Sequence, residues 1–280
     1  MFKSLRNNFL IYYTYSYIAG LLNCNKFRHV HTLLVFLGYP RSGSSILGSI
    51  LDAHKNILIA HELNILNYIK KGYTYKQLFF LLARNSRLFT RNGRISSGYI
   101  GLIEGQFNGK AKPCLVIGDK KAGATSGMLE GNPEVEQMLL DFYSDVKFIH
   151  IVRNPFDMIA TQAYKGNEKK LMVTDEDLTS SILFCEARFR TIDKLIKKGG
   201  MNIFTVNYES LISEPERIIA SILTWLGVDV YDGYINACKA HLFQTPHQSR
   251  HEVSWTDEQI NKVNTIISRY YFLMEYSFEN

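Results

Sequence analysis

Several features are scarce in this chain of 280 residues, and each scarcity excludes a class of function. The four cysteines, Cys24, Cys114, Cys185 and Cys238, lie far apart and form no C-x-x-C pair, so the sequence predicts neither a zinc site nor a redox pair. Buried free thiols in a reducing compartment are the simplest interpretation. The net charge of +6 is not gathered into a dense block of Lys or Arg, so nucleic acid is not an expected partner.

No apolar run reaches the ~20 residues that a membrane-spanning helix needs. The nearest candidate is Phe9–Leu22 (FLIYYTYSYIAGLL), which is rich in tyrosine. It has three interpretations: a helix packed on the domain, a helix at a membrane interface, or a targeting signal. The first is favoured, because tyrosines are unusual in the core of a signal peptide. We therefore expect residues 1–31 to form an N-terminal helical extension of a cytoplasmic protein, with membrane association as an alternative.

The rest of the chain alternates between strand-like and helix-like segments. The short apolar runs at 32–37, 57–60, 114–117, 148–152 and 203–206 do not alternate with polar residues, which is typical of buried parallel strands. Between them, Pro133 suits a first helical position, residues 213–216 (SEPE) have capping-box spacing, and Gly227 suits a helix end. This pattern predicts a three-layer α/β fold with a mostly parallel sheet, as one domain over residues 32–280.

Ligands of such a fold bind beyond the carboxyl ends of the strands. Residues 70–112 break the alternation, and we interpret them as helices and a glycine-rich loop inserted beside that edge.

Residues 38–45 (GYPRSGSS) have the form of a phosphate-binding loop without its lysine. They lie between a predicted strand and a predicted helix, where backbone N–H groups and the helix N-terminus hold an anion. Gly38 and Gly43 keep the glycines of the G-x-x-x-x-G-K-[ST] pattern, but Ser44 replaces the lysine. The loop can therefore hold a phosphate but is poorly equipped to act on the γ-phosphate of ATP. Its cation, Arg41, lies inside the loop.

A second candidate anion site follows the fourth predicted strand. In an NTPase this strand ends in an acid that holds Mg²⁺, whereas here Arg153 follows it. Asn154 can cap the next helix, with Pro155 in its first turn and Asp157 at the reciprocal capping position. Thr161 lies about two turns from Asn154, on the same side. Arg153 can make a bidentate contact to a phosphate, and Thr161 can add a hydroxyl.

These two segments resemble the sulfotransferases that use 3′-phosphoadenosine 5′-phosphosulfate (PAPS). One signature of that family is similar to P-R-S-G-[ST]-[ST] followed by L-D-A-H, and this chain has PRSGSS at 40–45 and LDAH at 51–54. The other is similar to R-N-P-x-D followed by Ser, and this chain has RNPFD at 153–157 and then Thr161. YESL at 208–211 and SWT at 254–256 add to a resemblance that spans roughly residues 32–275.

The resemblance implies that PAPS is the co-substrate and that no metal is needed. The 3′-phosphate would then contact Arg153 and Thr161, with Tyr208 and Arg250 elsewhere in the nucleotide site. The 5′-phosphosulfate would contact the loop residues Arg41, Ser42, Gly43, Ser44 and Ser45. This explains both the missing lysine and the missing Mg²⁺ ligand.

The acceptor must lose a proton as it attacks sulfur, which is work for a carboxylate or a histidine. Glu62, after the second predicted strand, resembles the glutamate base of the tyrosylprotein and other Golgi-type sulfotransferases. His61 is the alternative base, since cytosolic sulfotransferases use a histidine. Lys120, in GDK at 118–120, resembles the family's lysine that meets charge on the leaving oxygen, although Lys121-Ala122 replace the usual Thr-Pro.

The sequence thus predicts transfer of a sulfuryl group from PAPS to a hydroxyl or amine. The acceptor stays open among a carbohydrate, a lipid or small molecule, and a peptide. Two other functions stay open: a P-loop phosphotransferase, disfavoured by Ser44 and Arg153, and a nucleotide-binding protein without turnover.

Overall fold

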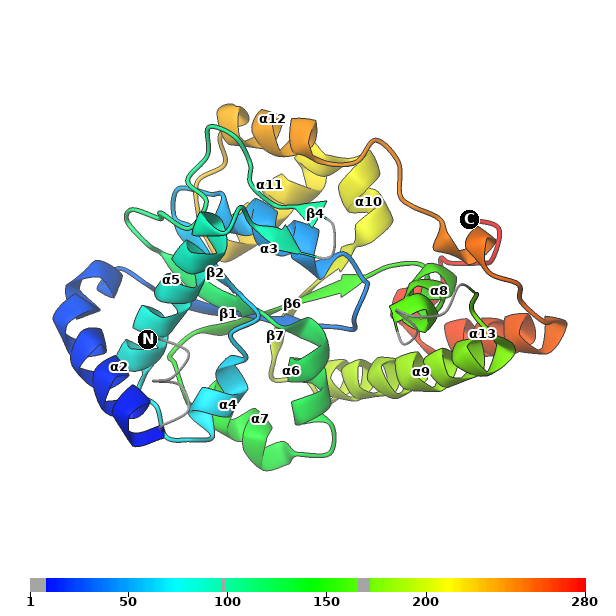
Figure 1. Ribbon diagram of the computed structural model, residues 1–280, viewed down its shortest axis with the longest axis horizontal. Helices are drawn as coiled ribbons and strands as arrows, with labels where there is room; N and C mark the ends of the chain where they lie inside the picture. Colours follow the sequence, from blue (N-terminus) through cyan, green and yellow to red (C-terminus); the bar gives the residue numbers. More distant parts are fainter. Residues whose placement is uncertain (1–8, 97–98, 166–171) are drawn as a thin grey trace.

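A sheet of five parallel strands, in the order β2-β5-β1-β6-β7, forms the centre of the protein. The computed structural model describes residues 9–96, 99–165 and 172–280, with helices on both faces of this sheet (Figure 1). The predicted α/β fold is therefore confirmed. The strands are β1 (Thr32–Leu37), β2 (Ile57–His61), β5 (Val116–Lys120), β6 (Val146–Val152) and β7 (Asn202–Asn207).

Both faces of the sheet are buried, which explains why its strands read as continuous apolar runs. All six residues of β1 are buried, and they alternate between two hydrophobic clusters, with Leu33 and Val35 in one and Leu34 and Phe36 in the other. The first cluster contains residues of α2 (Phe9–Asn23), α4 (Ile65–Ile69), α5 (Tyr75–Arg91), α7 (Pro133–Leu140), α8 (Pro155–Lys165), α9 (Asp175–Lys198) and α13 (Asp257–Arg269). The second contains residues of α3 (Ser44–Asp52), α10 (Tyr208–Ser213), α11 (Pro215–Leu226) and α12 (Asp232–His241).

Helix α6 (Ala122–Leu129) follows β5 and contributes to both clusters. The short elements are β3 (Ile95–Ser96), β4 (Tyr99–Ile100) and the 3₁₀ turns η1 (Cys24–Phe27), η2 (Ser249–Glu252) and η3 (Tyr271–Leu273).

Strand β5 differs from its prediction in a way that matters for the site. It begins and ends about two residues later than the apolar run at 114–117, so that Lys120 belongs to the strand. The polar residues stay in the ladder because both neighbouring strands continue beside them. Asp119 pairs with Val35 of β1 and Ala60 of β2, and Lys120 pairs with His61.

Residues 70–112 contain the crossover from β2 to β5. The predicted helical part is α5, which packs against both strands. Behind it, β3 and β4 form a small antiparallel pair that the sequence did not predict. Arg94 at the start of this part is buried and forms an ion pair with buried Asp52 at 2.6 Å. This contact anchors the glycine-rich part to the end of α3. Gly98, which belongs to it in the sequence, lies outside the described residues.

The predicted N-terminal helix is present as α2 and packs against α5. Gly20 lies at the closest point: a Cβ atom there would be 2.8 Å from the backbone carbonyl carbon of Lys76. Glycine therefore lets the two helix backbones touch. Residues 1–8 lie outside the described part. No helix among the described residues is long and apolar enough to cross a membrane.

The predicted helix ends are partly correct. Pro133 opens α7, and Gly227 ends α11 with a left-handed φ of 71°. The capping box at 213–216 is wrong, because Ser213 belongs to α10 and Glu214 at the N-cap of α11 makes no capping bond. The carboxylate of Glu214 instead accepts a bond of 2.5 Å from Arg217. Glu214 is the single residue between α10 and α11, so Ser213 is helical and is not placed to cap α11.

Candidate functional site

The carboxyl ends of β1, β2, β5 and β6 meet at one edge of the sheet, beside a cavity of about 570 Å³. Within the described part of the chain, the lining of this cavity includes five Arg and Lys side chains but a single carboxylate, that of Glu62. The cations are Arg41, Lys120, Lys121, Arg153 and Arg188. Such an excess of positive charge in a concave site favours an anionic ligand.

The predicted phosphate loop joins β1 to α3 and forms one wall of the cavity. Gly43 caps α3 with a φ of 92°, and Arg41 also has a left-handed φ of 70°. A Cβ atom on Gly43 would lie 2.4 Å from the ring of Tyr208, which packs directly over it. Glycine is therefore required here both for its backbone conformation and for the room it leaves. Ser44 and Ser45, in the first turn of α3, line the cavity.

Ser42 is the one loop residue whose side chain does not line the cavity. It is fully buried, and its Oγ donates a hydrogen bond of 3.0 Å to the backbone carbonyl of Tyr39. The Tyr39 hydroxyl is in turn bonded to Nε2 of His150 in β6 at 2.7 Å. Ser42 and Tyr39 thus connect the loop to the buried core at β6.

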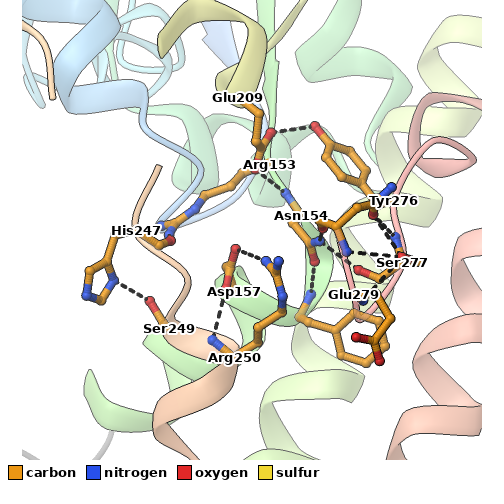
Figure 2. Close-up of polar contacts among 12 residues, drawn as sticks. Arg153, Asn154, Asp157, Glu209, His247, Ser249, Arg250, Tyr276, Ser277 and Glu279 are labelled. Atoms are coloured by element: carbon orange, nitrogen blue, oxygen red, sulfur yellow. Dashed lines mark hydrogen bonds and ion pairs between the residues drawn. The ribbon is translucent and has the colours of Figure 1, made fainter. Parts of the chain in front are cut away.

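Arg153 follows β6 and lies beside the loop in the lining of the cavity. Figure 2 shows its side chain near His247. Its side chain is almost completely buried. It donates to the backbone carbonyl of Arg41 at 3.3 Å and to that of His247. Its guanidinium carbon lies 5.1 Å from the centre of the Tyr208 ring. Among the described residues, the buried Nε of Arg153 has no hydrogen-bond partner, so one donor of this cation remains for a ligand.

Thr161 joins Arg153 in the lining, as its helical spacing predicts. Its hydroxyl contacts the backbone carbonyl of Asp157 at 2.8 Å and Ser249 Oγ at 2.9 Å. Ser249 also contacts His247 Nδ1 at 3.0 Å. The segment that ends in η2 is therefore tied to α8 beside the second anion site.

Arg250, which the resemblance assigns to the nucleotide site, has a buried side chain. It does not line the cavity but is buried beneath η2, where it forms an ion pair of 2.7 Å with buried Asp157. Asp157 also accepts a bond of 2.9 Å from the Arg250 backbone N–H. The reciprocal cap predicted for Asp157 is therefore wrong. The Asp157 carboxylate pairs with Arg250 instead. The backbone N–H of Asn154, which a reciprocal cap would bind, donates to the Glu209 carboxylate at 2.9 Å.

Asn154 does cap α8, because its side-chain oxygen accepts a 2.9 Å bond from the Phe156 N–H. Its amide nitrogen donates to the carbonyl of Ser277 at 2.8 Å. Glu209 also accepts a 2.8 Å bond from the hydroxyl of Tyr276. Figure 2 shows how these contacts fasten the C-terminal segment behind Arg153. They hold the end of β6 rigidly.

Glu62, Lys120 and Ser45 form a connected group on the other side of the cavity. Lys120 is buried and donates hydrogen bonds of 3.0 Å to both Ser45 Oγ and Glu62 Oε1. Lys121 approaches the other oxygen of Glu62 at 2.6 Å. Partial burial raises the pKa of Glu62, but these two ammonium groups outweigh it and lower the pKa to about 2. Burial also lowers the pKa of Lys120.

Asp119 holds Glu62 in place, a role that the sequence did not reveal. Its buried carboxylate accepts backbone bonds from Leu63 at 2.9 Å, Asn64 at 2.7 Å and Ile65 at 3.1 Å. These bonds fix the turn in which Glu62 has a left-handed φ of 58°. Burial raises the pKa of Asp119 to about 6. The sequence feature that could have indicated this role is GDK at 118–120, where an acid precedes the lysine at the end of a buried strand.

His61, the alternative base, does not line the cavity. Its ring stacks on that of Phe89, with the centroids 3.9 Å apart. Burial, helped by Lys120, lowers the pKa of His61 to about 4. The structure therefore brings Glu62, Lys120, Arg41, Arg153, Thr161 and Tyr208 together, with Gly43, Ser44 and Ser45 of the loop, and leaves out the side chains of His61, Ser42 and Arg250.

Other residues of the lining were not predicted, because they come from segments without a recognisable pattern. They are Ser96, Tyr99, Phe184, Arg188, Phe243 and His247. Tyr99 and Phe243 lie close together, with ring centroids 5.8 Å apart, and Arg188 forms an ion pair with Glu130. The three aromatic residues add apolar surface to the cavity, and the guanidinium carbon of Arg188 lies 5.2 Å from the centre of the Phe184 ring.

Comparisons with known proteins agree with this picture. Residues 132–232, which include Arg153 and Tyr208, match the model of the sulfotransferase family. The sulfotransferase domain from the curacin biosynthetic pathway superposes with a TM-score of 0.56 at 14% identity, over 89% of this chain and 99% of that domain. The sulfotransferase STF9 from Mycobacterium avium superposes with a TM-score of 0.52 at 12% identity, over 92% of this chain and 81% of that protein.

No curated protein sequence gave a significant match. At these identities the superpositions show the fold, and the family match adds a similarity in sequence over residues 132–232. The predicted resemblance to sulfotransferases is confirmed.

Proposed function

From this similarity, we propose that the protein transfers a sulfuryl group from PAPS to an acceptor hydroxyl or amine. The observation that carries the proposal is Arg153, which stands where an NTPase would hold its Mg²⁺ acid and shares one cavity with a loop that lacks the NTPase lysine. A donor with phosphates at both its 3′ and 5′ positions needs two anion sites. The loop and the neighbouring Arg153 would supply them.

The residues present suit such a donor. The buried Nε of Arg153 has no partner among the described residues, and a 3′-phosphate would supply an acceptor for it. Thr161 would add its hydroxyl, and the N-terminus of α3, with Ser44 and Ser45, would receive the 5′-phosphosulfate. The bound donor supplies a sulfuryl group activated by its anhydride link to phosphate.

Glu62 is our proposed general base. It is the only carboxylate of the described cavity lining, and its side chain is 42% exposed and so open to an acceptor. With a pKa of about 2 in the free protein it is a poor base, because an efficient base has a pKa closer to the working pH. Donor binding would have to raise this pKa.

Lys120 provides a way to do so. Its ammonium already bonds both Ser45 of the loop and Glu62. An anion held by the loop competes for this ammonium, and weaker contact with the cation raises the pKa of Glu62. Lys120 then donates to the leaving oxygen while Glu62 takes the acceptor proton. Donor binding and base activation would thus be linked through one side chain.

The first experiment measures thermal stabilisation by 3′-phosphoadenosine 5′-phosphate (PAP), by ATP with Mg²⁺ and by AMP. A ligand at about 100 times its Kd stabilises the folded state by about 2.7 kcal/mol, which is a shift of about 5 °C for a chain of this size. We expect the shift with PAP in the wild type, and its loss in Arg153→Ala. The matched control is Arg217→Ala, which removes an exposed arginine that does not line the cavity.

A shift with ATP–Mg²⁺ and none with PAP would refute the proposal in favour of a phosphotransferase. An equal PAP shift in the wild type and in Arg153→Ala would refute the role of Arg153. Tight PAP binding without turnover of PAPS across carbohydrate, lipid and peptide acceptors would favour a binding protein.

A further inference from the structure

Helix α2 has its apolar face on the outside. Its largest exposed side chains include Leu10 at 70%, Ile18 at 53% and Leu22 at 80%. With Ile11, Tyr17 and Leu21, which are also exposed, they lie on the side of the helix opposite buried Tyr12, Ser16 and Gly20 and so form one face. A surface helix of a globular protein normally turns such a face to the core. Nothing among the described residues covers it.

The inner face of α2 explains how this arrangement is stable. There Gly20 touches the backbone of α5, and Ser16 Oγ accepts a bond of 3.3 Å from Gln77 Nε2 of that helix. Tyr12 is buried beside them. Small and polar groups and the tyrosine rings thus attach α2 to the domain, and its Leu and Ile side chains are left for another partner.

Cations lie near both ends of α2. At one end of α2, Lys71 Nζ lies 5.8 Å from the centre of the Phe9 ring, and at the other, Lys26 donates to Asn23 at 2.7 Å. Two hollows of about 310 and 250 Å³ flank η1 just beyond α2. Within the described part of the chain, their linings carry no carboxylate and six cations: Lys26, Arg28, Lys76, Arg87, Lys110 and Lys112.

Acidic residues are also scarce in the first hundred or so residues of the sequence. Asp52 and Glu62 are the only acidic residues before Glu104. Asp52 is buried against Arg94, and Glu62 lies between Lys120 and Lys121 in the cavity. Neither of these two acids therefore neutralises the positive charge around α2.

We propose that α2 docks the protein on an anionic lipid bilayer and lies in the plane of the interface. Leu10, Ile18 and Leu22 would insert among the acyl chains, and exposed Tyr17 suits the headgroup level. The surrounding lysines and arginines would meet the anionic headgroups. A second copy of the chain fits less well, because it would bring the same cations against one another.

The docking face lies away from the candidate active site. The larger hollow is lined by Pro113 and Cys114, which precede β5, whereas the cavity lies at the carboxyl ends of the strands. Figure 1 shows α2 at the opposite end of the molecule from α8, which follows Arg153. A docked protein would keep its cavity open to water.

The test is co-sedimentation of the full chain with vesicles of phosphatidylcholine alone, or of phosphatidylcholine mixed with phosphatidylglycerol. The double variant Ile18→Glu/Leu22→Glu places two charges in the proposed contact. Its control, Val230→Glu/Met274→Glu, changes two exposed apolar residues, 47% and 60% exposed, outside α2. We expect the wild type and the control to bind the mixed vesicles, and the α2 variant to bind at least about tenfold more weakly.

Three results would overturn the proposal: a wild type that stays in solution with the mixed vesicles, equal binding by both double variants, or lipid-free dimers in light scattering that the α2 variant abolishes. If the glutamate pair fails to fold, Ile18→Ser/Leu22→Ser repeats the test with a smaller change. The readout needs no nucleotide, so it is independent of the proposed sulfuryl transfer.

Discussion

Replacing Asp157 with alanine should strongly destabilise this protein, because Arg250 would stay buried without its counter-ion. Both side chains are 2% exposed, and the guanidinium Nη1 lies 2.7 Å from the carboxylate. Within the described residues, Nε and Nη2 of Arg250 have no other hydrogen-bond partner. Breaking a buried pair by removing one partner costs about 3–5 kcal/mol.

This free-energy cost can be converted into a change in melting temperature. Unfolding entropy is about 2.1 cal/mol/K per residue, so each kcal/mol lowers the Tm of a 280-residue chain by about 1.7 °C. Asp157→Ala should therefore lower Tm by roughly 5–9 °C, measured by calorimetry or by circular dichroism. The double variant Asp157→Ala/Arg250→Met removes both charges and should recover much of this loss.

The control is Glu214→Ala, which breaks an exposed ion pair of 2.5 Å with Arg217 and should not measurably change Tm. If Asp157→Ala behaves like this control, water must reach Arg250 and the burial argument fails. If the double variant is as unstable as the single one, the unpaired charge is not the cause. Because η2 is held through this pair, Asp157→Ala should also weaken the PAP shift.

Three further predictions concern the cavity. Gly43→Ala should lower Tm by several degrees and abolish the PAP shift, because the new Cβ would lie 2.4 Å from the Tyr208 ring at a φ of 92°; an unchanged Tm would contradict the close contact. Asp119→Ala removes the acceptor of three backbone N–H groups, so Tm should fall while the PAP shift persists. A lower Tm together with loss of the PAP shift would mean that the damage spreads to the loop. The pKa of Glu62 is about 2 when folded and 4.5 ordinarily, so its ionised form stabilises the protein above about pH 4.5 and loses that effect as the pH falls to 2. The Tm difference between the wild type and Glu62→Gln should accordingly narrow over that interval, and a constant difference would refute the lysine contacts.

The strands and the two anion sites could be predicted from the sequence because their signals are local. A buried parallel strand is apolar on both faces, so the run at 32–37 predicts β1 to the residue. Its loop and Arg153 follow strands directly, and parallel strands end at one edge of the sheet. Chain connectivity alone therefore brings Arg41 and Arg153 to the same cavity.

The errors come from contacts between distant segments. Asp157 has the spacing of a capping residue, but Arg250, 93 positions away, provides a stronger partner for its carboxylate. The same contact holds the Arg250 side chain outside the cavity lining, an arrangement that no local pattern indicates. Phe184 and Arg188 line the cavity because α9 packs against α6 and α8. No local pattern marks residues of that kind.

The carboxylate of Glu62 acts as an internal counter-ion for the cavity. Because it already neutralises part of the charge of Lys120 and Lys121, fewer salt anions need to gather there before a ligand arrives. Ligand binding would exchange one anion of the protein for another, rather than mainly displace anions of the solvent. The affinity of the cavity for a doubly phosphorylated nucleotide should then depend less on ionic strength than its five cations alone would indicate.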